Sequence, residues 1–508
     1  MKAPIRLIFI ITVTTFFACE AKAQAPNILH DTLYSAVLQE KRALNIILPK
    51  DTFNQYEIIY CLDDVAEFQR MEWGFLHGEG FIPKNTILVG ITNTRKNGAD
   101  MRDRDFTPTA TGGVSGGADQ FLQFIKKELM PHMQQQYKAG ASGHTLYGGS
   151  LGGLFVMYVF LTDPDLFTSY IAIDPSLWWD HQYLNKLADK KINTFSYANN
   201  TLFIAGRKGI AFDYMGISGM DSILRAKAPA ALDWTCIPFT NETHYSTNFK
   251  GFWEGLKFSY GGFYASTGGY NTSRKIYIKP TNGIVLKDQP FTLFSYNLNP
   301  DRYIHYTTDG SIPDQSSPTL KGEETPVALR SDATIHVKSI GKRTVYNREA
   351  TAYLKTGNVI PASPKPAGVQ SGGLHYACYE GEPDLKKLLP TKTGIADETF
   401  DINQLSKQPF FYLVKEGFIE ITAPGYYIFE MGPGNEKTKV YLAGRQILGA
   451  HFEPGDGENY VLPLEKGFYP YRVVYFHQKD SGPLPDIYLK LPGRDDFPMP
   501  LEMQYSKR

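Results

Sequence analysis

A glycine-rich turn constrains the fold of this chain more than any other feature of its sequence. Residues 148–153 read Gly-Gly-Ser-Leu-Gly-Gly, after a short apolar run at 144–147 and before the apolar stretch 154–160. The first run predicts a strand, and the second predicts the start of a buried helix. A strand that passes through Gly-x-Ser-x-Gly into a helix makes a sharp turn, the nucleophile elbow, which holds the serine hydroxyl above the sheet. Glycine is needed on either side, because a side chain there would collide with the neighbouring strand or helix.

Ser150 in this turn is therefore a candidate nucleophile. The N-terminus of the following helix favours a negative charge that develops nearby, so we expect the backbone amide of Leu151 to bind an oxyanion. A nucleophilic serine also needs a general base. His244 is placed to act as one, since it lies in the predicted loop that follows the strand-like run 234–239. His144 lies at the start of the elbow strand, at the wrong edge of the predicted sheet, and is expected to be structural.

Two carboxylates could complete a catalytic triad, in which the acid orients the imidazole and stabilises its cation. Asp213 comes in the loop after the strand-like run 200–205, which is the strand position that usually supplies the acid in α/β-hydrolases. Asp174 directly follows the strand-like run 169–173, one strand earlier. We prefer Asp213 and keep Asp174 as the alternative.

The N-terminus indicates export from the cytoplasm. Residues 1–23 have the pattern of a secretory signal, with basic residues, an apolar run and a small-residue cleavage site. We expect a secreted or periplasmic protein, with lipid anchoring at Cys19 as the less favoured alternative. No later stretch is long enough to predict a transmembrane helix. Three further cysteines are too few and too scattered for a disulfide framework.

The charge balance argues against some classes of partner. The chain has 52 Lys and Arg residues against 52 Asp and Glu residues, which gives no electrostatic case for binding nucleic acid or an anionic membrane. The composition is 14% aromatic, which favours β-rich modules and sugar-like ligands. Oligomeric state is not predictable from these features.

The chain divides into three predicted domains after the signal. Residues 24–262 alternate strand-like and helix-like segments, which predicts a doubly wound α/β fold. Residues 275–355 show short strands and turns without a helical stretch, and residues 373–508 are again rich in strands. These patterns predict two all-β, sandwich-like domains. Linkers are expected at 264–273 and, rich in proline, at 360–373.

The first domain resembles the esterase family of α/β-hydrolases, which includes ferric-siderophore esterases, feruloyl and acetylxylan esterases, and esterase D. The resemblance covers nearly all of residues 30–260 and rests on several motifs in the right order besides the elbow. They are Tyr60-Cys-Leu-Asp-Asp64, Arg102-Asp-Arg-Asp-Phe-Thr-Pro108, Gly116-Gly-Ala-Asp-Gln-Phe121, Glu128-Leu-Met-Pro131, Asp174-Pro-Ser-Leu-Trp-Trp179, and the closing helix Gly251–Phe258. The resemblance implies that the loop at Asp64 and Val65 supplies a second oxyanion-hole amide.

Two departures from the family pattern matter. The family usually has glycine where Asp64 stands. It also usually has an acid a few residues after the glycine equivalent to Gly206, where this chain reads Arg207-Lys-Gly. The second departure is the reason that both carboxylates stay open as the triad acid.

The two β domains resemble modules of carbohydrate-active proteins. Residues 306–313 and 333–338 are similar to the small Ig-like domain at the C-terminus of chitobiases. Residues 373–381, 425–429 and 440–444 are similar to PA14 modules, some of which bind sugars through calcium held by paired aspartates. The corresponding loop here, residues 432–436, lacks that pair, so we predict a structural β-sandwich with no metal and no cofactor.

These observations predict a secreted serine esterase that acts through an acyl-enzyme. The appended modules favour an ester of an acylated carbohydrate as substrate, with ferric-siderophore lactones as the alternative. A second alternative is a non-catalytic carbohydrate-binding surface protein on a degenerate hydrolase scaffold.

Four further residues are candidates for substrate binding. Trp178 and Trp179 follow a predicted strand end on the side of the elbow, where ligands of open α/β sheets gather. We expect one to be buried and one to line the cleft as a platform for a sugar or an aromatic acyl group. Arg102 and Arg104 lie in the loop after the strand at 86–91 and could bind an anionic part of the substrate. The alternative for the arginines is a salt bridge to a neighbouring aspartate.

Overall fold

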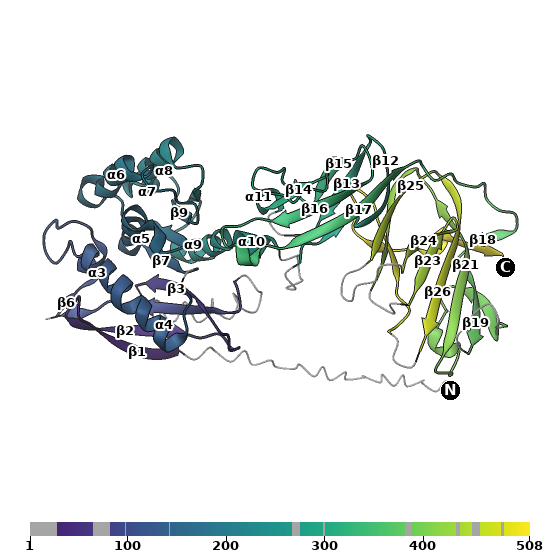
Figure 1. Cartoon of the computed structure of the whole chain (residues 1–508), viewed down its shortest axis with the longest axis horizontal. Coiled ribbons are helices and arrows are strands. Elements are labelled where there is room, and N and C mark those ends of the chain that lie inside the picture. The colour runs from purple at the N-terminus through teal and green to yellow at the C-terminus, as the bar shows by residue number, and fades with distance from the viewer. Residues whose placement is uncertain are drawn as a thin grey trace, which may run out of the picture.

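The computed structural model shows an elongated molecule with three regions in chain order (Figure 1). It describes residues 28–63, 82–96, 98–141, 143–266, 275–297, 300–381, 389–432, 437–449, 458–478 and 482–507. The predicted signal at residues 1–23 lies outside these residues. No helix within the described ranges is both long and apolar enough to cross a membrane.

An eight-stranded mixed sheet forms the centre of the first region, in the order β1-β2-β4-β3-β7-β8-β9-β10. The strands are β1 (Ile28–Ser35), β2 (Glu40–Ile47), β3 (Glu57–Leu62), β4 (Thr86–Ile91), β7 (Thr145–Gly149), β8 (Ser169–Ile173), β9 (Thr201–Arg207) and β10 (Asp233–Phe239). From β4 to β10 all neighbours are parallel, whereas β1 and β2 are antiparallel. The strands β4 and β8 are buried along their whole length, as expected for continuous apolar runs covered on both faces.

Helices cover both faces of this sheet. The helices are α2 (Arg102–Phe106), α3 (Ala118–Phe124), α4 (Met130–Tyr137), α5 (Leu151–Thr162), α6 (Trp179–Lys191), α7 (Ile210–Tyr214), α8 (Ile217–Lys227), α9 (His244–Ser259) and α10 (Gly261–Ala265). One apolar core contains residues of α3, α5, α6 and α8, and a second core on the other face contains residues of α9 and α10. A short ribbon, β5 (Arg95–Lys96) with β6 (Ala99–Asp100), lies outside the sheet. The predicted doubly wound α/β pattern therefore describes the first region.

The second region is a small β-sandwich, as predicted. One layer contains β11 (Ile278–Lys279), β13 (Pro290–Ser295) and β15 (Glu324–Ala328). The other contains β14 (Ile304–Thr307), β16 (Ala333–Ser339), β17 (Glu349–Gly357) and β12 (Asn282–Leu286). Two single-turn helices, α11 (Pro300–Tyr303) and a 3₁₀ turn at Thr344–Tyr346, also occur in this stretch, which the sequence pattern had predicted to be free of helix.

The third region is also built of strands, and it shares a sheet with the second. In that sheet β12 is followed by β25 (Asn459–Leu464), β22 (Gly425–Met431), β27 (Ile487–Lys490) and β28 (Phe497–Pro498). The other sheet of the third region contains β18 (Val369–Ser371), β29 (Gln504–Lys507), β21 (Phe411–Ile421), β26 (Gly467–His477), β23 (Lys439–Leu442) and β24 (Arg445–Leu448), with β19 (Leu374–Glu380) and β20 (Lys392–Ala396) beside them.

A glycine makes the shared sheet possible. Gly283 of β12 pairs in parallel with Val461 of β25, and its backbone has φ of 135°. A Cβ at this position would collide with the backbone of Val461. The segment predicted as the second linker is likewise attached to the third region, because Ile360 and Ser363 form bridges to Leu464 and Phe468. The two β regions are therefore joined by more than a connecting chain.

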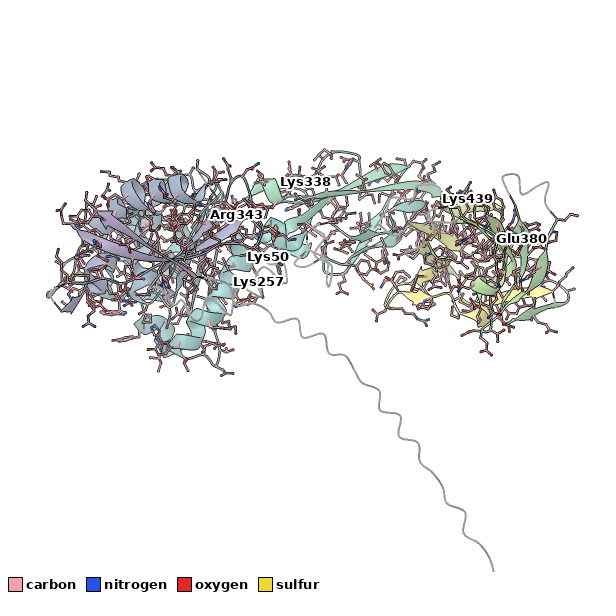
Figure 2. All side chains as sticks on the ribbon, turned by 90° about the horizontal axis from the view of Figure 1, so that it is seen from below. Lys50, Lys257, Lys338, Arg343, Glu380 and Lys439 are labelled. Carbon is pink, nitrogen blue, oxygen red and sulfur yellow. The ribbon has the colours of Figure 1, made fainter. Side chains whose placement is uncertain are left out.

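The second region also joins the first, at the amino ends of the parallel strands. Arg343 is buried at this junction (Figure 2). Its guanidinium donates to the Glu57 carboxylate at 2.5 Å, and to Thr145 Oγ1 at 2.7 Å and Ser169 Oγ at 3.1 Å. Glu57, Thr145 and Ser169 are the first residues of β3, β7 and β8. The junction therefore lies at the amino ends of the parallel strands, whereas the elbow follows the carboxyl end of β7.

Candidate active site

The turn at residues 148–153 has the geometry of a nucleophile elbow. Ser150 follows β7, caps the N-terminus of α5, and has φ of 56° and ψ of −119°, a conformation that costs energy for any residue with a side chain. A Cβ on Gly148 would lie 2.5 Å from the backbone of Gly152, so the strand and helix approach too closely for any other residue. The strain is thus held in place by tight packing on both sides of Ser150.

The hydroxyl of Ser150 is half-buried beside the loop that follows β8. Ser150 donates its backbone N–H to the Ile173 carbonyl at 2.9 Å, and its carbonyl accepts from the Ser176 N–H at 3.0 Å. The two serine Oγ atoms are 3.4 Å apart. These bonds fix the elbow against the end of β8, where Asp174 lies.

His244 is brought to Asp174. The distance from His244 Nδ1 to Asp174 Oδ2 is 2.7 Å. Asp174 is fully buried at the carboxyl end of β8, with φ of 42°, while the His244 side chain is 35% exposed. A carboxylate that accepts from Nδ1 fixes the ring and leaves Nε2 as the nitrogen able to take a proton.

A capping box positions His244. The histidine is the first residue of α9, where the sequence predicted a loop. The preceding residue, Thr243, accepts from the Ser246 N–H at 3.1 Å, and the Ser246 hydroxyl accepts from the Thr243 N–H at 2.8 Å. These reciprocal bonds fix the first turn of α9 and therefore the starting point of the histidine side chain.

The first turns of α9 also pack against the elbow. The amide side chain of Asn248 occupies the space where a Cβ on Gly149 would be, so no larger residue fits at position 149. Asn248 Nδ2 donates to the His244 carbonyl at 3.0 Å. The elbow that carries Ser150 and the helix that begins with His244 are thus in direct contact.

Arg207, at the end of β9, is a residue of this site that the sequence analysis did not select. Its Nε donates to Asp174 Oδ2 at 2.6 Å, and its backbone N–H donates to Oδ1 at 3.4 Å. Burial alone would raise the pKa of Asp174, but the hydrogen bonds from His244 and Arg207 outweigh it and hold the pKa below its ordinary value. Asp174 is therefore ionised at neutral pH.

The preferred acid of the sequence analysis lies elsewhere. Asp213 is exposed on α7, after β9, and the structure pairs His244 with Asp174 instead. The physical reason is that β9 continues through Gly206 to Arg207, whose side chain takes the place beside the carboxylate. The arrangement that the structure offers is Ser150, His244 and Asp174.

Of the three residues predicted to form an oxyanion hole, the described part of the chain includes Leu151. Leu151 is the first residue of α5, so its N–H belongs to the helix N-terminus, where amides have no acceptor within the helix. The predicted partners Asp64 and Val65 lie outside the described residues. Asp63 directly precedes them at the end of β3, with φ of 67°.

The two tryptophans differ in exposure. The Trp178 residue is 42% exposed, whereas Trp179 packs against the core and donates from Nε1 to Thr109 Oγ1 at 3.1 Å. Their ring centroids are 5.8 Å apart, with planes inclined by 50°. The pair does not present one flat surface, and Trp178 is the more exposed ring, whereas Trp179 is half-buried instead of buried as one tryptophan was expected to be.

The two arginines are both in ion pairs. Arg102 donates from Nε and Nη2 to the Asp63 carboxylate, at 2.5 and 2.7 Å. Arg104 contacts Glu40 at 2.6 Å and Asp105 at 2.7 Å. The Arg104 pairs belong to a buried cluster that holds α2 against β2. Arg102 instead lies near the elbow, because its partner Asp63 is next to Gly152.

His144 has a structural environment. Its Nδ1 accepts from the Ile58 N–H at 3.1 Å, and its Nε2 lies 2.9 Å from the Gly140 carbonyl. Burial lowers the pKa of His144 to about 4, so the ring is neutral. Within the described ranges no group of three or more His, Cys, Asp or Glu side chains could hold a metal ion.

Several known proteins match this part of the chain. The ferri-bacillibactin esterase of Bacillus subtilis (strain 168) is 34% identical over 172 residues, which are 30% of this chain and 59% of that protein. The siderophore triacetylfusarinine C esterase of Aspergillus fumigatus is 41% identical over 86 residues, 16% of this chain and 30% of that protein. The chain therefore spans less than two thirds of the length of these relatives.

A solved structure of an IroE-like serine hydrolase from Shewanella oneidensis is 29% identical, with a TM-score of 0.42, and the match covers 47% of this chain and 81% of that one. Residues 35–204, which include Ser150 and Asp174 and end before Arg207 and His244, match the sequence model of the esterase family, described as "Putative esterase".

Proposed function

We propose that this chain is a serine carboxylic-ester hydrolase of the α/β-hydrolase type, with Ser150, His244 and Asp174 as its triad. The observation that carries the proposal is the His244–Asp174 hydrogen bond of 2.7 Å beside a strained serine elbow. Backbone strain and a buried ionised carboxylate are both costly, and they coincide here at the carboxyl ends of two adjacent strands. The match to the esterase family and the hydrolase neighbours support the same activity.

The reaction follows from the positions of these groups. His244 removes the proton from Ser150 Oγ as the oxygen attacks the ester carbonyl, and Asp174 stabilises the imidazolium that forms. The Leu151 amide binds the oxyanion of the tetrahedral intermediate. His244 then gives the proton to the leaving alcohol, and a water molecule activated by the same histidine releases the acyl group from Ser150.

Esters of siderophores are the substrate class that we propose. The named relatives are esterases of ferri-bacillibactin, triacetylfusarinine C, enterobactin and apo-salmochelin. Acylated carbohydrate, favoured by the sequence analysis, depended on the resemblance of the β regions to carbohydrate-associated modules. Secretion, predicted from residues 1–23, is part of the same proposal.

The test of the activity is covalent labelling followed by a substrate panel. A fluorophosphonate probe should label the wild-type protein on Ser150, and Ser150→Ala should lose both labelling and turnover of p-nitrophenyl acetate while keeping its thermal unfolding midpoint. His244→Ala should lose turnover by a similar factor, because the two residues act as a unit. Absence of labelling in the folded wild-type protein would favour the non-catalytic alternative. A ferric-siderophore lactone, a feruloyl ester and acetylated xylan then distinguish the substrate classes by kcat/KM.

A further inference from the structure

One carboxylate oxygen of Asp174 accepts hydrogen bonds from two residues. Oδ2 accepts from His244 Nδ1 at 2.7 Å and from Arg207 Nε at 2.6 Å. The carboxylate is fully buried, and the Arg207 side chain is 29% exposed. The backbone N–H of Arg207 reaches the second oxygen, Oδ1, at 3.4 Å. Arg207 thus fixes both the rotation and the charge environment of the acid.

The guanidinium changes what this carboxylate does for the histidine. A carboxylate alone beside an imidazole favours the protonated ring. A permanent positive charge on the same oxygen opposes that effect, because arginine stays charged throughout the working pH range. His244 therefore faces an ion pair that is close to neutral overall instead of a full negative charge.

We propose that Arg207 is a positioning residue that holds Asp174 toward His244 and partly offsets the negative charge that Asp174 presents to the imidazole. The inference rests on the proposed esterase function and adds a residue that acts through Asp174 without touching the reacting atoms. It assigns a role to the position where the family resemblance leads one to expect an acid.

Among the residues that the structure describes, three other segments that flank this site carry charged side chains. Glu242, two residues before His244, forms an ion pair of 3.2 Å with Lys250 of α9. Lys208 and Asp213 are exposed on the segment after β9. The Asp63–Arg102 pair lies at the end of β3, against the other side of the elbow. Two of these sets are themselves paired and the third is exposed to solvent, so the charges in direct contact with Asp174 are those of His244 and Arg207.

The test is the pH dependence of kcat/KM for p-nitrophenyl acetate, with the rate of fluorophosphonate labelling as a second readout. The midpoint of the acidic limb should move up by about one pH unit in Arg207→Gln, since Asp174 then presents its full negative charge to the imidazole. Arg207→Lys keeps the charge and should move the midpoint by less than half as much, while its plateau rate falls because the fixed geometry of the guanidinium is lost. Arg225→Gln, which removes an exposed arginine paired with Asp221 on α8, is the matched control and should leave the midpoint unchanged.

A double variant separates action through Asp174 from a direct effect. In Asp174→Asn the added Arg207→Gln change should shift the midpoint by much less than it does in the wild type. The proposal is overturned if Arg207→Gln lowers only the plateau, or if its shift is equally large in the Asp174→Asn background. A wild-type protein that neither turns over ester nor reacts with the probe would instead overturn the proposed function, and this inference with it.

Discussion

Asp174 and Asp213 differ in what their carboxylates touch, and this difference predicts opposite effects of the same substitution. Asp174→Asn should lower kcat by about 10³–10⁴-fold, because an amide cannot stabilise the imidazolium and can hold the ring in the wrong tautomer. Asp213→Asn should change kcat less than twofold, since its side chain is exposed on α7. Steady-state kinetics on p-nitrophenyl acetate measures both, and the reverse ranking would return the acid to Asp213.

The buried neutral His144 makes the stability of the first region depend on pH. Burial lowers the pKa of His144 from 6.5 to about 4, so the unfolded chain binds a proton that the folded chain refuses between these values. The folded state therefore loses stability as pH falls from about 6.5 toward 4, by up to about 3 kcal/mol.

Urea unfolding at several pH values, followed by tryptophan fluorescence, checks this prediction for the wild type and His144→Gln. The variant should be less stable than the wild type at pH 7.5, and the gap should narrow as the pH is lowered. A gap that stays constant from pH 7.5 to 4.5 would contradict the assignment of the pH dependence to this ring. The carboxylates titrate alike in both proteins, so their contribution to the pH dependence of stability cancels in the difference.

How much of the site the sequence could predict depended on whether a residue's role is local. Ser150 follows from its own turn, because glycine spacing and the strand–helix change are encoded within a dozen residues. Which carboxylate pairs with His244 depends on which of two neighbouring strand ends faces α9. That arrangement is set by tertiary packing, which a local sequence pattern does not record. The signal was present in the sequence: Arg207 stands where an acid was expected, and an aspartate, Asp174, stands one strand earlier.

At the scale of elements, α9 packs closely against β8, the strand that directly precedes Asp174. Cβ atoms added at Gly251 and Gly255 of α9 would each lie 2.5 Å from side-chain atoms of Ile173 and Ile171 in β8. The helix starts with His244, and Ile173 directly precedes Asp174. The helix-to-strand spacing therefore sets the distance between His244 and Asp174.

Gly251→Ala should disturb catalysis through this spacing. The added methyl forces α9 or Ile173 to move, which should cost about 1–3 kcal/mol of stability and lower kcat/KM by about tenfold or more. Thermal unfolding and ester turnover measure the two effects. Ile173→Ala in the same chain vacates the space, so the double variant should recover part of the lost activity. Full activity of the single variant would show that the spacing tolerates a methyl group.

The strands and helices of the first region were largely predictable, since buried strands such as β4 are continuous apolar runs. The shared sheet of the β regions was not. It depends on one parallel contact between Gly283 and Val461, which lie far apart in the chain, and a sequence pattern records which face is apolar but not which distant strand covers it. The helical position of His244 was missed for a related reason: its cap uses two polar residues within a segment that reads as a loop.

At the scale of the whole molecule, the three regions form a chain of joined bodies with the site at one end. The junction of the first two regions is at the amino ends of the parallel strands, and Ser150 and Asp174 are at the carboxyl ends. The β regions therefore attach to the sheet of the first region without covering its elbow (Figure 1). We predict that the β regions stabilise the first region. A change at the junction should therefore leave the rate of ester turnover unchanged.

Arg343 is the residue on which this junction most depends. It enters the first region from the second, is 6% exposed, and stacks over the Tyr260 ring at 4.1 Å while pairing with Glu57. Removing one partner of a buried ion pair leaves the other charge without compensation, which typically costs about 3–5 kcal/mol. Arg343→Ala should therefore destabilise the first region by about that amount, measured by urea unfolding.

The matched control is Arg302→Ala, because Arg302 also crosses the junction but forms an exposed pair with Asp233 at 2.6 Å. An exposed pair contributes about 0–1 kcal/mol, so this variant should unfold close to the wild type. Arg343→Met combined with Glu57→Gln removes both buried charges and should recover part of the loss. At urea concentrations below their unfolding midpoints, all three variants should keep the wild-type kcat. The reason is that the junction lies at the amino ends of the parallel strands, whereas the proposed triad lies at the carboxyl ends. Two results would contradict this prediction. One is a loss of stability in Arg343→Ala no larger than that in Arg302→Ala, and the other is a fall in kcat of the folded Arg343→Ala variant.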